Sequence, residues 1–248
     1  MHVTDVDSDA ASAVAAELGA PAHASALDVS DPEACRALAH ETPDLRVWVN
    51  NAGLLVTGAS WTQDDETRRR AFAVNALGLI NGTDAALGVM REAGHGRILN
   101  VISMAGLTPA PSQTLYSATK HAALAYTLGT QGDLRRCGIR DVRLCAICPD
   151  GVWTPMLEPR IRDPEAWPSW TGVMYPPERI AEVVAGLVER PRPLVTIPRW
   201  RGGLLRAFAA MPRVGFALLP LVERDARRRQ RAWAERVESG QTLWTNVR

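Results

Sequence analysis

A tyrosine and a lysine stand four residues apart in the stretch TLYSATKHA, residues 114–122. Positions i and i+4 of a helix share a face, so Tyr116 and Lys120 are expected to lie side by side. A phenol has a pKa of about 10 and is a poor base at neutral pH, and a neighbouring ammonium lowers that pKa by stabilising the phenolate. The pair could then pass a proton to or from a substrate oxygen. The same spacing also fits a surface lysine beside a half-buried tyrosine.

Lys120 is the only lysine in a chain that contains 27 arginines. An ammonium is a compact charge with three rotatable donors, whereas a guanidinium is a planar, delocalised fork. A single lysine among so many arginines favours a position that needs a point charge, and this supports the chemical interpretation of the pair.

Short runs rich in β-branched residues alternate along the chain with longer stretches of helical periodicity. Strands are expected at 2–6, 22–29, 47–52, 97–103, 142–147 and 194–198, and the longest helices at 65–91, 113–137 and 177–190. This alternation predicts a Rossmann-like α/β fold with a doubly wound, mostly parallel sheet. Ser8 and Gly19 are expected to cap the first helix, and Ser30 and Glu33 to form a capping box for the second.

Polar residues follow several of the expected strands. In a parallel sheet of this class, ligands bind beyond the carboxyl ends of the strands. The residues at those ends are Asp5, Asp28 with Val29, Asn50 with Asn51, Ser103, and residues 149–154. They are therefore expected to converge on one edge of the sheet.

The composition is that of a globular protein with a sizeable core. Of the 248 residues, 46% are apolar and 22% are charged. The net charge of +1 gives no case for a nucleic-acid partner. Cys145 and Cys148 fall in an apolar run that reads as a buried strand, where residues three apart point to opposite faces, so we expect structural thiols and no metal site. Free thiols and the lack of a signal peptide favour a reducing, cytoplasmic compartment.

The last fifth of the chain differs in charge from the rest. Residues 199–248 carry 11 arginines against 4 acidic residues, whereas residues 1–198 carry 17 basic against 23 acidic residues. We therefore divide the chain into a Rossmann-like body, 1–198, and a basic, partly apolar helical tail, 199–248. The tail could pack on the body or on a partner subunit, which we favour, or it could associate peripherally with an anionic membrane surface. Arginines and prolines interrupt its apolar stretch, so no spanning helix is expected there.

Five motifs occur in a fixed order. They are NNAG at 50–53, VNALG at 74–78, Ser103 thirteen residues before Tyr116, YSATK at 116–120, and P-x-x-V-x-T at 149–154. In this order and spacing the chain resembles the single-domain short-chain dehydrogenase/reductases over about residues 2–200. The resemblance implies an NAD(P)-dependent oxidoreductase that interconverts a secondary alcohol and a ketone, and a homo-oligomer paired through its long helices.

The resemblance also implies roles for individual residues. Tyr116 would be the general acid/base, Lys120 would lower its pKa and bond the nicotinamide ribose, and Ser103 would polarise the substrate oxygen. Asn75 would interrupt a helix and hold a proton-relaying water. An asparagine inside the apolar run AFAVNALGLI is unfavourable for a helix, which points to a local reason for it. Ser103 could otherwise simply end a strand, and Asn75 could be a solvated helix residue.

The cofactor contacts implied by the resemblance lie at the strand ends. An acidic residue after the first strand, here Asp5, would accept hydrogen bonds from the adenosine ribose and favours NAD over NADP. The other implied contacts are Asp28 and Val29 to the adenine, Asn50, Ala52 and Gly53 beside the riboses, Tyr116 and Lys120, and Val152 and Thr154 to the carboxamide. The family usually has Pro-Gly where this chain has Pro149-Asp150, so the nicotinamide pocket or the substrate entrance is expected to differ.

No glycine-rich turn precedes Asp5, although the family places one about 20 residues before the acidic residue. The implied first strand would lie between the strands at 2–6 and 47–52, so its absence is expected to expose sheet edges and remove pyrophosphate donors. We favour a start inside a longer reading frame, with about 30 further residues in the working protein. The alternative is a degenerate relative without catalysis, acting as an interaction or membrane-surface module.

The segment after the last cofactor strand is expected to form the substrate loop. Its large side chains include Trp153, Met156, Trp167 and Trp170. Flat, apolar side chains suit a bulky hydrophobic alcohol or ketone, such as a steroid-like or long-chain carbonyl compound. The tryptophans could equally pack the loop onto the core.

Overall fold

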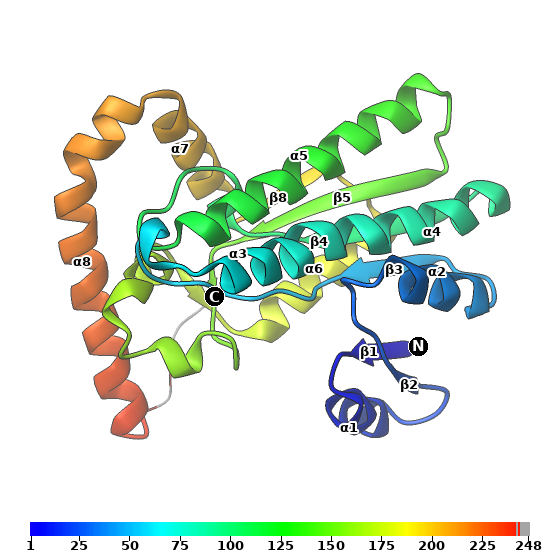
Figure 1. The fold of residues 1–248 in the computed structure, drawn as a ribbon, viewed down its shortest axis with the longest axis horizontal. Coiled ribbons are helices and arrows are strands. Elements are labelled where there is room, and N and C mark those ends of the chain that lie inside the picture. Colours follow the sequence, from blue (N-terminus) through cyan, green and yellow to red (C-terminus); the bar gives the residue numbers. More distant parts are fainter. Residues whose placement is uncertain (242, 244–248) are drawn as a thin grey trace.

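The computed structural model describes residues 1–241 and 243, and strands alternate with helices through most of this length (Figure 1). The strands are β1 (His2–Asp5), β2 (His23–Ala26), β3 (Val47–Asn50), β4 (Gly96–Val101), β5 (Val142–Pro149), β6 (Gly151–Val152), β7 (Met174–Tyr175) and β8 (Leu194–Ile197). The α-helices are α1 (Ser8–Leu18), α2 (Pro32–Glu41), α3 (Asp65–Phe72), α4 (Leu79–Ala93), α5 (Thr114–Arg136), α6 (Pro177–Glu189), α7 (Arg199–Ala210) and α8 (Pro212–Glu238). The predicted α/β fold with parallel strands is confirmed.

The parallel strands do not form one continuous sheet. β3, β4, β5 and β8 make a four-stranded sheet in the order β3-β4-β5-β8, and β1 pairs only with β2. Figure 1 shows β1, β2 and α1 as a separate unit beside this sheet. β3 is the outermost strand, and its Val47 and Val49, which share one face of the sheet, are 37% and 45% exposed. The break therefore falls where the sequence predicted an exposed edge, between the strands at 2–6 and 47–52.

Helices cover both faces of the four-stranded sheet. Ile98 of β4 and Leu144 of β5 pack with Met90 of α4, whereas Leu99 and Cys145, their neighbours in sequence, pack with α6 on the opposite face. This is the alternation that strand geometry imposes. Cys148 points to the same side as α5, opposite to Cys145, and all four cysteines are free. The two thiols of the C-x-x-C pair are thus separated by the sheet, as predicted.

Aspartates cap the first two helices. The Asp7 carboxylate accepts hydrogen bonds from the N–H groups of Asp9 and Ala10 at the start of α1. The Asp31 carboxylate accepts from those of Glu33 and Ala34 at the start of α2. The predictions of Ser8 and Ser30 as caps are therefore each wrong by one residue, because an aspartate in the adjacent position outcompetes the serine hydroxyl. Gly19 ends α1 at a φ of 70°, as predicted.

A buried polar network joins the sheet to α4 and α5. Asn50 of β3 donates to Asn100 of β4 over 2.8 Å, and it accepts from the Trp48 indole over 2.8 Å. Asn100 donates to Thr127 of α5 over 2.8 Å. Gly82 of α4 faces this network, and a Cβ on it would lie 2.2 Å from Oδ1 of Asn50.

We expect Gly82→Ala to destabilise the protein, since the new methyl group would displace a locked side chain. The expected loss is about 1–3 kcal/mol in the free energy of unfolding, measured by urea denaturation. Gly88→Ala is the matched control, because Gly88 lies on the same helix with nothing within 4 Å of its added Cβ. The control is expected to be neutral or to gain up to about 1 kcal/mol from helix propensity. Equal effects of the two variants would contradict the packing argument.

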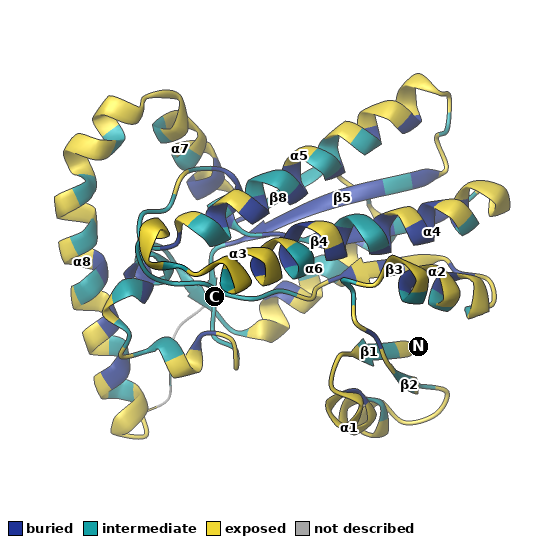
Figure 2. Cartoon of the chain, in the orientation of Figure 1, coloured by how far each residue is buried: buried dark blue, intermediate teal, exposed yellow. Residues whose placement is uncertain are grey.

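The basic tail begins at α7, directly after β8, and its second half packs on the substrate loop. Gln230 of α8 donates to the carbonyl groups of Ile161 and Asp163 over 3.1 and 2.7 Å. The rings of Trp153 and Trp233 are 5.7 Å apart. The first half of α8 is largely exposed (Figure 2). Residues 226–238 thus hold the second half of the tail against the substrate loop.

Within the described residues, only the joined helix 65–93 is long and apolar enough to cross a membrane by length and composition. Half of its most apolar stretch is buried inside the structure, and it packs as α3 and α4 against the sheet.

Candidate active site

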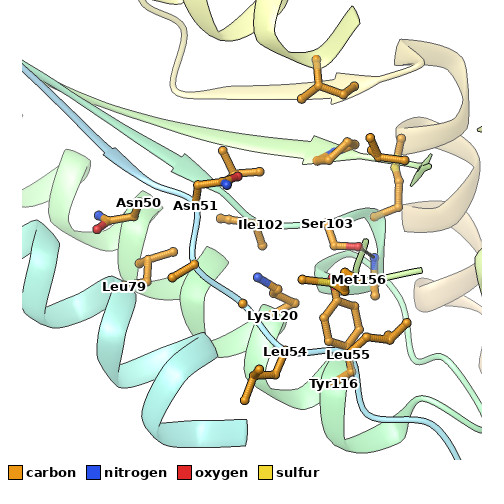
Figure 3. Close-up of a pocket in the computed structure, with 18 of the residues that line it drawn as sticks. Asn50, Asn51, Leu54, Leu55, Leu79, Ile102, Ser103, Tyr116, Lys120 and Met156 are labelled. Atoms are coloured by element: carbon orange, nitrogen blue, oxygen red, sulfur yellow. Dashed lines mark hydrogen bonds between the residues drawn. The ribbon is translucent and has the colours of Figure 1, made fainter. Parts of the chain in front are cut away.

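One cavity of about 1970 Å³ runs from the exposed edge of β3, beside β1, to the carboxyl ends of β4 and β5 and on to α7 and α8. Its lining includes most of the residues that the sequence singled out: Asp5, Asp28, Val29, Asn50, Ala52, Gly53, Ser103, Tyr116, Lys120, Val152, Thr154, Met156 and Trp167. Figure 3 shows Ser103, Tyr116 and Lys120 around one space, with Met156 and Leu55 beside them. The structure therefore brings the expected strand-end residues together.

Two elements position the hydroxyl groups of Ser103 and Tyr116. Ser103 follows β4 and its hydroxyl accepts from the N–H of Ala105 over 3.1 Å, which starts a short 3-10 turn at Met104. Tyr116 lies in the first turn of α5, so its phenol faces the same point from the helix. Burial raises the pKa of the Tyr116 phenol, and a hydrogen bond with Ser103 partly offsets this. The phenol is therefore protonated at neutral pH.

Lys120 follows one helical turn later and is buried, with 4% of its surface exposed. Its Nζ atom lies 5.6 Å from the centroid of the Tyr116 ring. Burial lowers the pKa of Lys120 from 10.5 to about 8. The sequence predicted that Lys120 lowers the pKa of Tyr116. In this structure burial raises the pKa of Tyr116 because it disfavours the phenolate, and the lowering by Lys120 stays a prediction.

The low pKa of Lys120 can be measured directly, since no other side chain carries an aliphatic amine. We expect amine-reactive labelling of the peptide that contains Lys120 to reach half its maximal rate near pH 8, where the ammonium loses its proton. Mass spectrometry of the labelled peptides separates Lys120 from the N-terminal amine. The peptide from Lys120→Met is the blank. A half-point near the ordinary lysine value of 10.5 would contradict the assigned burial.

Asn75 interrupts the long helix between α3 and α4. It lies in a π-helical segment, η2 (Ala73–Gly78), and its side chain is 1% exposed. Its amide accepts from the N–H of Leu54 over 2.6 Å and donates to the Leu54 carbonyl over 2.8 Å. These bonds fix the chain that follows NNAG. The local reason for an asparagine in this apolar helix is therefore the pairing of its amide with that loop, and it is not solvated.

Gly53 brings this loop close to the two central polar groups. A Cβ on Gly53 would lie 3.4 Å from both Oδ1 of Asn75 and Nζ of Lys120. The loop backbone at Gly53 thus lies close to both Asn75 and Lys120.

Two tryptophans occupy places that differ from the predictions, whereas Asn50 lines the cavity and its side chain also belongs to the buried network. The Asn50 side chain is engaged in the buried network and points away from Lys120 in Figure 3. Trp153 packs on Trp233, and Trp170 is 3% exposed under the loop, so neither lines the large cavity. Both tryptophans hold the substrate loop against α8, because large apolar rings gain more from contact on both sides than from one exposed face.

Several apolar residues of the cavity were missed by sequence reasoning. They include Leu54, Leu55, Ile102, Met104, Leu205 and Phe208. The first two directly follow NNAG, which could have indicated them. Leu205 and Phe208 belong to the tail, and no motif signalled that α7 would reach the cavity.

Asp150, which stands where the family usually has a glycine, forms a buried ion pair. Its carboxylate lies 2.8 Å from Nε of Arg201 in α7, and it accepts from the N–H of Val173 over 2.9 Å. Arg201 also donates to the Thr171 hydroxyl over 2.6 Å. Burial raises the pKa of Asp150, and Arg201 lowers it in part. The pair therefore joins the end of β5, the substrate loop and the tail.

Comparison with known proteins gives the family of the chain. The family model described as short chain dehydrogenase matches residues 1–165. The chain belongs to this family. This short-chain dehydrogenase is 31% identical over 195 residues to the 3-beta-hydroxysteroid dehydrogenase of Comamonas testosteroni, with 73% of this chain and 75% of that protein covered.

Further relatives of this short-chain dehydrogenase differ in length and in activity. It is 32% identical over 146 residues to the mouse estradiol 17-beta-dehydrogenase 11, covering 57% of this chain but only 49% of that relative. It is 32% identical over 205 residues to the inactive 2-(S)-hydroxypropyl-CoM dehydrogenase 2 of Xanthobacter autotrophicus, covering 77% and 88% of the two chains. The closed form of a serine dehydrogenase complexed with NADP+ superposes with a TM-score of 0.70 at 26% identity, covering 79% of this chain and 83% of that chain.

Two parts of the cavity of this short-chain dehydrogenase carry the residues that would hold a nicotinamide dinucleotide. Gly53, Tyr116 and Lys120 line one part of the cavity, and Asp5, Asp28 and Val29 line another. Among residues 1–241 and 243, however, no glycine-rich turn leads from a strand into a helix to bind the pyrophosphate.

Proposed function

We propose that the protein is an NAD-preferring oxidoreductase that interconverts a lipophilic secondary alcohol and its ketone. The observation that carries the proposal is the convergence of Ser103, Tyr116 and Lys120 on one cavity at the strand ends. A phenol, a hydroxyl and an ammonium around one point provide a proton donor, a hydrogen-bond partner for an oxygen, and a positive charge. Membership of the short-chain dehydrogenase family supports the reaction class.

The side chains divide the acid–base work. In ketone reduction, the Tyr116 phenol donates its proton to the carbonyl oxygen while Ser103 donates a hydrogen bond to the same oxygen. In alcohol oxidation, the Tyr116 phenolate takes the hydroxyl proton. The positive charge of Lys120 stabilises the phenolate that exists on either path. A bound nicotinamide dinucleotide would supply or accept the hydride at the substrate carbon.

The preference for NAD rests on Asp5. This residue ends β1 and lines the cavity, where its carboxylate would accept hydrogen bonds from a ribose and repel a 2′-phosphate. Val152 and Thr154 line the opposite part of the cavity and would contact the carboxamide. The structural relative complexed with NADP+ shows that the fold also accepts the phosphorylated cofactor in another protein.

The proposal of a lipophilic substrate is based on the side chains that line the cavity. Met156, Trp167, Leu55 and Phe208 contribute apolar surface there. Such surface favours a bulky hydrophobic compound. The names of two relatives, an estradiol and a 3-beta-hydroxysteroid dehydrogenase, support a steroid-like or long-chain alcohol.

A spectrophotometric assay tests the proposal. Purified protein would be mixed with NAD or NADP and a panel of steroid alcohols, long-chain secondary alcohols and small polyols, and formation of the reduced nicotinamide would be followed. We expect turnover of lipophilic alcohols with NAD in preference to NADP. Turnover restricted to polyols would refute the substrate class, and a preference for NADP would refute the role of Asp5.

A second candidate function is a scaffold without catalysis that acts as an interaction module. It is favoured by the open edge of β3, which is not hydrogen-bonded to β1 and could pair with another chain. One relative is itself named an inactive dehydrogenase. Thermal shift with NAD separates the two candidates, because only the oxidoreductase is expected to be stabilised by cofactor.

We also propose a homo-oligomer paired through the long helices α4 and α5, in a reducing compartment that keeps the four thiols free. Sedimentation equilibrium would measure the oligomeric state. A monomer at all concentrations would refute the pairing.

A further inference from the structure

Residues 199–222 form an exposed apolar hairpin, comprising α7 and the first half of α8. Its exposed large apolar residues are Trp200, Leu204, Met211, Val214, Phe216, Leu218, Leu221 and Val222. Three of them, Trp200, Phe216 and Leu221, are 62–65% exposed. Figure 2 shows the exposed surface of α7 and the adjoining part of α8 at the margin of the molecule. This concentration far exceeds the single exposed apolar residues that are normal on a soluble surface.

The part of α8 that follows Arg213 is apolar on every side. Residues 214–222 read VGFALLPLV and contain no polar side chain. A helix that is apolar all round is normally covered by protein or lipid. The second half of α8 is covered, since it packs on the substrate loop, but the first half is exposed. The apolar side chains of the hairpin are therefore exposed, although a helix of this composition is normally buried against protein or lipid.

The charges on the hairpin are all positive. Residues 199–222 contain four arginines and no acidic residue. Arg201 is used in the buried pair with Asp150. Arg199, Arg206 and Arg213 are exposed, and no carboxylate of the described residues forms an ion pair with them.

The positive charges of the hairpin distinguish between two surfaces that could bury it, a second copy of the chain and a lipid bilayer. A symmetric contact between two copies would place the same patch against itself, so that arginines would face arginines with no acidic residue in the patch to offset them. An anionic lipid surface accepts both the apolar side chains and the unpaired guanidinium groups.

We propose that the apolar hairpin docks on the surface of an anionic lipid bilayer. The apolar run 214–222 is too short to span a bilayer, which needs about 20 residues. It would lie in the interface with its apolar side chains among the acyl chains and its arginines at the headgroups.

The hairpin also forms one wall of the cavity. Leu204, Leu205, Phe208 and Phe216 line the same cavity as Ser103 and Tyr116. Docking would therefore place the cavity beside the lipid, so that a lipophilic alcohol could enter without crossing water. This consequence rests on the proposed function, whereas docking itself is independent of catalysis.

Vesicle sedimentation tests the docking without any assay of activity. The full chain would be centrifuged with vesicles of phosphatidylcholine alone or mixed with phosphatidylglycerol. We expect the protein to sediment with the mixed vesicles at low salt, and to be released at high salt because screening weakens the arginine contacts. Absence from the mixed-vesicle pellet at low salt would overturn the proposal.

Two variants and two matched controls locate the binding surface. Phe216→Ser/Leu221→Ser is expected to weaken binding by about tenfold or more, since it removes two large apolar contacts. Trp61→Ser is its control, because Trp61 is 84% exposed but lies outside the hairpin. Arg206→Gln/Arg213→Gln is expected to weaken binding to the mixed vesicles by about thirtyfold. Its control is Arg135→Gln/Arg140→Gln, which removes two exposed arginines elsewhere.

The remaining outcomes also decide the question. Equal loss in a variant and its control would overturn the proposal. So would an apolar variant that converts a dimer into a monomer and leaves vesicle binding unchanged, because a second copy would then cover the hairpin. Should the apolar variant fail to fold, quenching by brominated lipid is measured on the wild type and on Trp200→Phe. Docking predicts quenching that is reduced in Trp200→Phe, and identical quenching in both proteins would contradict it.

Discussion

The variant Tyr116→Phe is expected to lose about 10²- to 10⁴-fold in kcat/KM for the lipophilic alcohol, measured by formation of reduced nicotinamide. The change removes the hydroxyl that donates and accepts the proton and retains the ring against which Lys120 lies. Binding of NAD, followed by thermal shift, is expected to remain, so the loss is in the reaction step.

A second tyrosine on the same helix provides the control. Tyr126 lies on α5 and its hydroxyl donates to Asp84, away from the cavity lining. Tyr126→Phe is expected to retain activity. Undiminished turnover in Tyr116→Phe would remove the basis of the proposed function, because a group other than the phenol would then transfer the proton.

The variant Asp150→Ala is expected to cost about 3–5 kcal/mol in the free energy of unfolding, measured by urea denaturation. The side chains of Asp150 and Arg201 are only 7% and 10% exposed, so loss of the carboxylate leaves a buried guanidinium without its counter-charge. The end of β5, the substrate loop and α7 would lose their shared contact.

The double variant Asp150→Ala/Arg201→Leu tests the pairing itself. Removing both charges is expected to restore most of the lost stability, because an apolar pair needs no charge compensation. A double variant as unstable as the two single variants added together would show that the two residues act independently and would contradict the ion pair.

The arrangement of the sheet and the gathering of the site could be predicted from the sequence. Both depend on local patterns: β-branched runs set the strands, and parallel strands place their carboxyl ends at one edge. The order of Ser103, Tyr116 and Lys120 along β4 and α5 then fixes them around one point. The break between β1 and β3 was also predictable, since it follows from a strand that the resemblance implied and the sequence lacks.

Other features depend on contacts between distant residues and were not predictable. The side-chain amide of Asn50 is held by Trp48 and Asn100, and only the packing of two strands reveals this. Trp153 and Trp170 were indistinguishable from Trp167 by sequence, and their places depend on where α8 packs. The raised pKa of Tyr116 likewise reflects burial, which the i, i+4 spacing does not determine.

The scarcity of lysine has a practical consequence for following the unfolding of this protein. A lysine-specific endoprotease could hydrolyse only the bond between Lys120 and His121, which lies in the middle of α5, where Lys120 is buried. Digestion would yield two fragments, 1–120 and 121–248, and only from molecules in which this helix has opened. The rate at which this one bond is hydrolysed therefore measures the fraction of molecules in which α5 has opened.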